Sequence, residues 1–253
     1  MQPNHNTILI TGGGSGIGLA LAEAFHANGN QVIIAGRRKE VLDEAIAANP
    51  GMKAAILDIE NAVAIRSFGE QMKRDYPALN VIINNAGIMR PERLHDGPLA
   101  DAEATITANL LGPIRLTAAL LPILMSQPHA AIMTVSSGLA FLPLAMTPTY
   151  CATKAAIHSY TQSLRYQLKD TAVQVLELIP PYVQTELMGT GQASDPNAMP
   201  LNDFISEVMN IINTSPNVTE ICVERVKPLR FAEANGGYDG FFKKFNDAFS
   251  ATH

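Results

Sequence analysis

Short runs of apolar, mostly β-branched residues recur along the chain, and each is followed by residues spaced as on a helix face. The runs show no alternation between polar and apolar positions, which is typical of parallel strands that helices cover on both faces. Alternating strands and helices predict a doubly wound sheet with its ligands at the carboxyl ends of the strands. The expected strands are residues 7–10, 32–35, 54–57, 81–83, 131–135, 173–179 and 221–223.

No linker, internal repeat or low-complexity tract divides the sequence, so residues 1–253 predict one domain. Its expected fold class is α/β, a Rossmann-like doubly wound sheet of about seven parallel strands flanked by helices. Residues 186–202 are rich in Gly, Ser, Asn and Pro, and they predict a mobile substrate loop within that domain.

The composition describes a folded protein, since 47% of the 253 residues are hydrophobic and 16% are charged. A formal net charge of −5, without a basic run, argues against nucleic acid as a partner. The longest apolar stretch, residues 110–125, is interrupted by Gly112, Pro113, Arg115 and Pro122, so no membrane span is expected. Two cysteines without metal-binding spacing favour a reducing, cytoplasmic location and predict no metal site.

A glycine-rich turn, Thr-Gly-Gly-Gly-Ser-Gly-Ile-Gly at residues 11–18, directly follows the first strand and opens the first helix. Such clusters also mark ordinary turns. Here the glycines would let the chain approach a pyrophosphate closely, and the helix N-terminus would offer free N–H groups. The position between strand and helix favours a dinucleotide loop, although the spacing Gly12-x-x-x-Gly16-x-Gly18 differs from the common Gly-x-Gly-x-x-Gly.

The end of the second strand indicates which dinucleotide is bound. An acidic residue there would bind the adenosine ribose and repel a 2′-phosphate. This chain has Gly36 followed by Arg37 and Arg38, whose charge and planar donors suit a phosphate. The arginines could instead be solvated residues at a helix start. The absence of the acid together with the presence of the two bases favours NADP(H) over NAD(H).

Tyr150 and Lys154 lie four residues apart, and Ser137 precedes Tyr150 by thirteen residues. A free tyrosine has a pKa near ~10, so acid–base work near pH 7 needs the charged form to be stabilised. A lysine one helical turn away would supply that bias, and the serine hydroxyl could hold a carbonyl oxygen. A lone Tyr-x-x-x-Lys is more often a chance surface pair, so the other motifs must decide.

These motifs, together with Asn-Asn-Ala-Gly at residues 84–87, occur in the order found in the short-chain dehydrogenases/reductases. The chain resembles the classical members of that family over nearly its whole length. Residues 136–141, 150–160 and 223–233 also resemble the DltE-like branch, a label that identifies no substrate.

The resemblance implies roles for individual residues at the cofactor. The glycine turn would hold the pyrophosphate, Asp58 would bind the adenine, and Thr185 would hold the nicotinamide carboxamide. Pro181 replaces the family's usual glycine, so the turn before Thr185 is expected to be stiffer than usual. The implied cofactor contacts are Gly12, Ser15, Gly16, Ile17, Gly18, Arg37, Arg38, Asp58, Ile59, Asn85, Ala86, Gly87, Tyr150, Lys154, Pro180, Val183 and Thr185.

The same resemblance implies a catalytic set of Asn109, Ser137, Tyr150 and Lys154. Ser137 would hydrogen-bond the substrate oxygen, and Tyr150 would exchange the proton. Lys154 would bind the nicotinamide ribose and keep Tyr150 acidic, while Asn109 would hold a water in a proton relay. His158, one turn beyond Lys154, is expected to be a helix-interface residue because the proton chemistry is already assigned.

The expected function is that of an NADP-dependent oxidoreductase, which transfers a hydride between nicotinamide and a small-molecule carbonyl or secondary alcohol. The alternative is a regulatory protein that binds NADP(H) on the same fold without chemistry. The resemblance also implies a homodimer or homotetramer, assembled through the helices that hold Asn109 and Tyr150.

Overall fold

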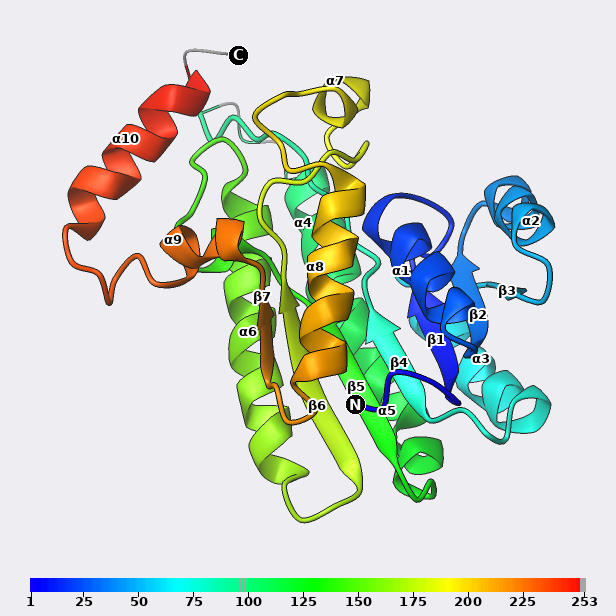
Figure 1. The fold of residues 1–253 in the computed structure, drawn as a ribbon. Helices are drawn as coiled ribbons and strands as arrows, with labels where there is room; N and C mark the ends of the chain where they lie inside the picture. Colours follow the sequence, from blue (N-terminus) through cyan, green and yellow to red (C-terminus); the bar gives the residue numbers. More distant parts are fainter. Residues whose placement is uncertain (96, 98, 251–253) are drawn as a thin grey trace.

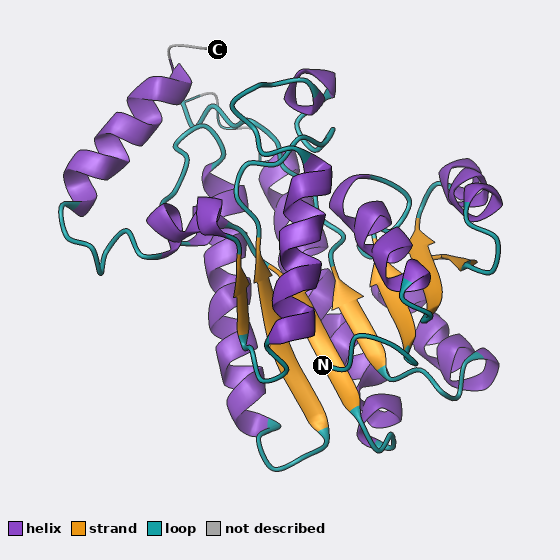
Figure 2. Cartoon of the chain, viewed as in Figure 1, coloured by secondary structure: helices purple, strands orange, loops and turns teal. Residues whose placement is uncertain are grey.

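A computed structural model, which describes residues 1–95, 97 and 99–250, shows one parallel sheet between two layers of helices (Figure 1, Figure 2). The strand order is β3-β2-β1-β4-β5-β6-β7, and every pairing is parallel, so the predicted doubly wound sheet of seven strands is confirmed. The strands are β1 Thr7–Thr11, β2 Gln31–Gly36, β3 Lys53–Ile56, β4 Val81–Asn84, β5 Ala130–Val135, β6 Val173–Ile179 and β7 Glu220–Cys222.

Helices cover both faces of this sheet. α1, α2 and α8 bury their apolar sides on one face, and α3, α5 and α6 bury theirs on the other. The helices are α1 Gly16–Ala27, α2 Lys39–Ala48, α3 Ala62–Asp75, α4 Ala100–Ile106, α5 Gly112–Met125, α6 Pro148–Gln167, α7 Thr190–Ala193, α8 Leu201–Thr214, α9 Lys227–Arg230 and α10 Tyr238–Ser250.

The side chains of β1 show why the strands are apolar at consecutive positions. Ile8 and Ile10 belong to the core beneath α1 and α8, against which Ile17 of α1 also packs. Leu9 belongs to the core beneath α3, α5 and α6. Successive side chains of a strand point to opposite faces, and here both faces are covered.

The apolar stretch that begins near residue 110 lies in a helical run, Ala100–Met125, which continues through Gly112, Pro113, Arg115 and Pro122. Pro113 lacks the N–H that an α-helix would direct to the carbonyl of residue 109, and the run passes through a π-helical turn at Thr107–Leu111. By length and composition alone this run could cross a membrane. Half of its most apolar window is buried inside the protein, as in a core helix.

Residues 186–202 contain more structure than the expected mobile loop. They form α7 and lead into α8, and an isolated parallel bridge joins Val183 to Met199. The buried Gln192 side chain holds this segment, because its Nε2 donates to Val183 O and to Thr185 Oγ1. Composition predicts a mobile loop here because it does not reveal such a tertiary contact.

Candidate active site

The parallel sheet gathers the predicted site residues at one edge. Because all strands point in the same direction, the segments that follow them meet at the carboxyl edge. A dinucleotide could therefore extend along this edge from the segment after β3 to the segment after β6. In spatial order the segments contain Asp58, Arg37, Gly12, Asn85, Ser137 and Pro180.

The turn between β1 and α1 has the shape of a phosphate cradle. Gly12 has a φ of +65°, and a Cβ there would lie 3.0 Å from Ala86 Cα. A Cβ on Gly18 would lie 2.3 Å from Gly12 O, so α1 packs too closely on the turn for a side chain. α1 begins at Gly16, and the Ser15 hydroxyl before it makes no capping hydrogen bond. The N–H groups of the first turn and this hydroxyl therefore fit an anion such as a pyrophosphate.

Thr11 joins the ends of β1 and β4, a role that the sequence did not reveal. Its Oγ1 accepts hydrogen bonds from the N–H groups of Asn85 (3.1 Å) and Ala86 (3.0 Å). Asn85 Nδ2 donates in return to Thr11 O at 2.9 Å. These bonds fix Asn85 and Ala86, both expected at the cofactor, beside the glycine turn.

Arg37 is paired with a carboxylate that the sequence analysis did not single out. Its Nη1 lies 2.8 Å from Glu60 Oε1, and the Arg37 side chain is 56% exposed. Glu60 in turn donates its backbone N–H to Asp58 Oδ1 at 3.0 Å. Arg38 is exposed at the start of α2, and no ion pair joins it to a residue that the structure describes. Glu60 therefore offsets part of the positive charge that follows β2.

Asn109 lies in the π-helical turn and is buried. Its side-chain amide bonds the backbone of Ile88 twice, since Oδ1 accepts from the N–H and Nδ2 donates to the carbonyl, both at 2.8 Å. Nδ2 also donates to Thr153 Oγ1 on α6 at 3.3 Å. A Cβ on Gly87 would lie 3.0 Å from Asn109 Oδ1, and Ile59 is buried against the end of the same turn. Asn109 therefore holds the segment after β4 against α6, and its water-holding role stays a prediction.

Ser137, just after β5, is the serine that meets Tyr150. Its hydroxyl hydrogen-bonds the Tyr150 phenol and accepts the Leu139 N–H at 3.1 Å. The neighbouring Ser136 hydroxyl is buried and finds no partner among the described residues. Ser137 and Tyr150 are both buried, so two hydroxyl groups converge where a carbonyl oxygen could accept from them.

The surroundings of Tyr150 differ from the expected ones. Burial raises the pKa of Tyr150 well above its ordinary value, and the hydrogen bond with Ser137 offsets only part of that rise. Lys154 does not offset this rise, and its Nζ lies 5.5 Å from the centroid of the Tyr150 ring. Burial therefore opposes the acidic phenol that the resemblance implies, because the phenolate loses its hydration. The role of Lys154 in keeping Tyr150 acidic stays a prediction.

Lys154 reaches past Tyr150 to the end of β5. Its Nζ donates to Val135 O at 2.8 Å, which leaves two of the three ammonium hydrogens for other acceptors. Burial lowers the pKa of Lys154 to about 8, and the negative charge of Glu177 opposes this shift. An ammonium with free donors at this place is compatible with the implied ribose contact, which stays a prediction.

The segment after β6 runs beside the glycine turn. A Cβ on Gly16 would lie 3.6 Å from Thr185 Cβ. Pro180 O accepts the Gly138 N–H at 2.9 Å, which ties the ends of β6 and β5 together, and Val183 is buried. The predicted residues thus lie on both sides of the place expected for the cofactor, while the contact of Thr185 with nicotinamide stays a prediction.

Apolar side chains from separate parts of the chain surround Tyr150. Leu144 and Cys151 are buried with it, and Phe245 and Phe249 of α10 pack against that cluster. The remaining members are Met89, Leu139 and Met146. The contribution of α10 was missed, because an amphipathic pattern indicates a helix without showing which surface it covers.

Asn246 fastens α10 over this side of the site. Its Oδ1 accepts the Ala145 N–H at 2.6 Å, and its Nδ2 donates to Pro143 O at 3.2 Å. The Phe249 ring also meets the edge of Tyr182, with 5.9 Å between centroids. Figure 1 shows α10 standing outside the layered body, at the carboxyl end of the sheet.

Known proteins share this sequence and fold. The family model described as short chain dehydrogenase matches residues 6–195. The uncharacterized oxidoreductase DltE of Bacillus subtilis (strain 168) is 40% identical over 252 residues, covering 97% of this chain and 98% of that protein. A serine dehydrogenase in its closed form with NADP+ is 27% identical with a TM-score of 0.76, covering 84% of this chain and 93% of its own.

A short chain dehydrogenase/reductase from Burkholderia phymatum, solved with NAD, shares the fold with a TM-score of 0.82 at 19% identity, over 93% of this chain and 95% of its own. The match to DltE also confirms the resemblance to the DltE-like branch. This chain therefore belongs to the short chain dehydrogenase family and is an NAD(P)-dependent oxidoreductase of that family.

Proposed function

We propose that this protein reduces the carbonyl group of an apolar small molecule with NADPH, with Tyr150 as the proton donor and Ser137 as the residue that holds the oxygen. The observation that carries the proposal is the buried, hydrogen-bonded pair of Ser137 and Tyr150 at the carboxyl edge of the sheet. Two converging hydroxyl groups, shielded from water, can bind a carbonyl oxygen and give it a proton.

The protonation of Tyr150 favours the reductive direction. Because burial raises the pKa of Tyr150, its phenol keeps its proton at neutral pH and can donate it to the oxygen that becomes an alcohol. When bound, NADPH would supply the hydride for the carbonyl carbon. Oxidation of a secondary alcohol would use the same groups in reverse, with Tyr150 accepting the proton.

The preference for NADPH rests on residues of this chain. The glycine turn suits the pyrophosphate of either dinucleotide, whereas Arg37 and Arg38 suit a 2′-phosphate. Among the structural neighbours the serine dehydrogenase was solved with NADP+ and the Burkholderia phymatum protein with NAD, so the fold alone selects neither cofactor.

The substrate is proposed to carry an aliphatic or aromatic group next to its carbonyl. Leu144, Phe245 and Phe249 form an apolar wall around Tyr150, and a charged substrate would lose its hydration against that wall.

The Tyr150→Phe variant tests this function. We expect reduction of a panel of aldehydes and ketones, followed as NADPH oxidation, to fall by about 10²–10⁴-fold, because the proton donor is lost. NADPH binding, measured by fluorescence titration, should stay near that of the wild type. Tyr160→Phe is the matched control, because Tyr160 lies on the same helix and packs in the core away from Ser137.

Retained turnover in Tyr150→Phe would contradict the proposed mechanism. A wild-type protein that binds NADPH but reduces no carbonyl of the panel would support the regulatory alternative instead.

A further inference from the structure

A fully buried carboxylate, Glu177, lies on β6 behind the active site. It is in register with Thr134 on β5 and with Glu220 on β7, so these three side chains point to the same face of the sheet. The Glu177 side chain is 0% exposed. Two carboxylates opposite each other on neighbouring strands repel, and a buried one is costly without a partner, so this pair requires hydrogen-bond donors or cations.

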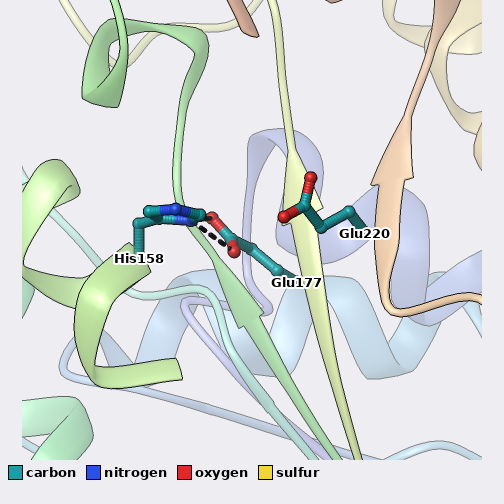
Figure 3. Close-up of side chains that lie close together, drawn as sticks. All are labelled: His158, Glu177 and Glu220. Atoms are coloured by element: carbon teal, nitrogen blue, oxygen red, sulfur yellow. Dashed lines mark hydrogen bonds and ion pairs between the residues drawn. The ribbon is translucent and has the colours of Figure 1, made fainter. Parts of the chain in front are cut away.

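His158 is the first of these partners. It lies on α6, one turn beyond Lys154, and its Nδ1 is 2.8 Å and 3.0 Å from the two oxygens of Glu177. Figure 3 shows the imidazole from α6 and the carboxylate from β6 pointing toward each other. The expected helix-interface histidine thus has a defined task, which is to clamp the Glu177 carboxylate between helix and sheet.

Glu220 points toward His158 and Glu177, and the atoms of these three residues that could bind a metal ion lie within 4.8 Å of one another (Figure 3). A cluster of one histidine and two carboxylates has the composition of a metal site. However, Arg230 Nε and Nη2 bind the two Glu220 oxygens at 2.8 Å and 3.0 Å. A guanidinium therefore already supplies the positive charge that a metal ion would bring.

The cluster also reaches the segment that follows Ser137. The Phe141 ring makes an edge contact with His158 at 4.7 Å between centroids, and the Arg230 guanidinium lies 4.4 Å above the same ring. The side chains of His158 and Arg230 thus contact the segment after β5, which holds Ser137, and His158 itself lies on α6, the helix that holds Tyr150.

We propose that Glu177, clamped by His158, is a positioning residue of the active site and serves as the counterion that keeps Lys154 an ammonium beside Tyr150. Lys154 lies one turn before His158 on α6, and its Nζ donates to Val135 O, whose partner on β6 is Leu178, the residue after Glu177. Burial favours the neutral form of Lys154, and the charge of Glu177 opposes it. This inference rests on the proposed function, in which Lys154 acts as a cation at the cofactor. The titratable and charged groups around the pair are Tyr150 next to Lys154, and His158, Glu220, Cys222 and Arg230 around Glu177.

The titration of Lys154 in the protein without cofactor tests this inference. It can be followed by NMR of 13Cε-labelled lysine, with the Lys154 resonance assigned as the one that Lys154→Arg removes. In the wild type the pKa of Lys154 should be about 8. Glu177→Gln should move the midpoint to lower pH by about one unit or more, because the charge that favours the ammonium is gone. The ammonium, and with it tight NADPH binding, should then be lost at a lower pH.

Glu220→Gln is the matched control. It removes a carboxylate of the same cluster, but the charge of that carboxylate is already neutralised by its ion pair with Arg230. The midpoint of the Lys154 titration should therefore stay at the wild-type value. A midpoint that is unchanged in Glu177→Gln, or that falls equally in Glu220→Gln, overturns the proposal. If Glu177→Gln fails to fold, Glu177→Asp is used instead, because its side chain is one methylene shorter and moves the carboxylate away from Lys154. An unchanged Lys154 midpoint in that variant also overturns the proposal.

Added Zn²⁺ separates a counterion from a metal ligand. We expect the wild type to bind no stoichiometric Zn²⁺ at this cluster. Stoichiometric binding in the wild type that is lost in both Glu177→Gln and Glu220→Gln would assign the cluster to a metal and overturn the proposal. The lysine titration needs neither substrate nor turnover, so its failure is distinguishable from failure of the proposed reduction.

Discussion

Arg37 and Arg38 are neighbours in sequence but have different electrostatic surroundings. Arg37 forms an ion pair with Glu60. Because both side chains are partly exposed, this ion pair stabilises the protein by at most about 1 kcal/mol. A 2′-phosphate carries more charge than a carboxylate and can compete for Arg37. Arg38 has no such competitor in the described part of the chain, so it is the arginine most available to the cofactor.

Arg38→Ala should therefore weaken NADPH binding by about tenfold, the loss of roughly one charge-assisted hydrogen bond, while NADH binding changes little. Parallel titrations with both cofactors measure this difference. Lys39→Ala is the matched control, because Lys39 is the next exposed cation and is engaged by Asp43. Tighter binding of NADH than of NADPH by the wild type would contradict the proposed preference.

At the scale of elements, α10 shapes the substrate side of the site without contributing to the sheet. Phe245 and Phe249 of this helix face the cluster around Tyr150, while Phe242 stacks on Tyr238. One helix thus presents aromatic side chains in two different surroundings. Only the first surrounding bears on the proposed substrate binding.

We expect Phe249→Ala to raise the KM for bulky apolar carbonyls by up to about tenfold, since truncating this half-buried aromatic side chain removes part of the ~1.5–3 kcal/mol that a fully buried apolar side chain contributes. NADPH affinity should not change. Phe242→Ala on the same helix is the control and should leave the KM unaltered. Equal effects of the two variants would show that α10 acts through its stability and not through the pocket.

At the scale of the whole molecule, the helices that hold the site also carry exposed apolar side chains. Leu111 is 37%, Met125 51% and Tyr166 71% exposed, on the run that contains Asn109 and on α6. Exposed apolar groups on neighbouring helices favour association. This agrees with the assembly that the family resemblance implies, which stays a prediction for this chain.

Size-exclusion chromatography with light scattering should show a dimer or tetramer, and Tyr166→Glu should shift it to a smaller species, because burying an unpaired carboxylate at an interface is costly. Val63→Glu is the control, since Val63 is 62% exposed on α3, which is not one of the helices that the resemblance implies at the interface. A monomeric wild type would refute the expected assembly.

The sequence by itself determined the sheet and the order of the chemistry along its edge. Consecutive apolar residues such as Ile8, Leu9 and Ile10 predict a strand buried on both faces, and that pattern is local. Once the strands are parallel, the segments after them must share one edge, so Gly12 and Ser137 come to the same edge although they are far apart in sequence. The glycine turn could also be recognised from the sequence, because the residues whose backbone conformation requires glycine lie close together along the chain.

Only the tertiary structure decided the surroundings of the side chains. The pKa of Tyr150 rises because of burial, and spacing to Lys154 does not reveal how deep the phenol lies. Glu60 reaches Arg37 and α10 reaches Tyr150 across long stretches of chain, and Glu177 is an isolated acid in an apolar strand until His158 is folded against it. Burial and long-range pairing depend on which surfaces the whole chain brings together, so no local pattern encodes them.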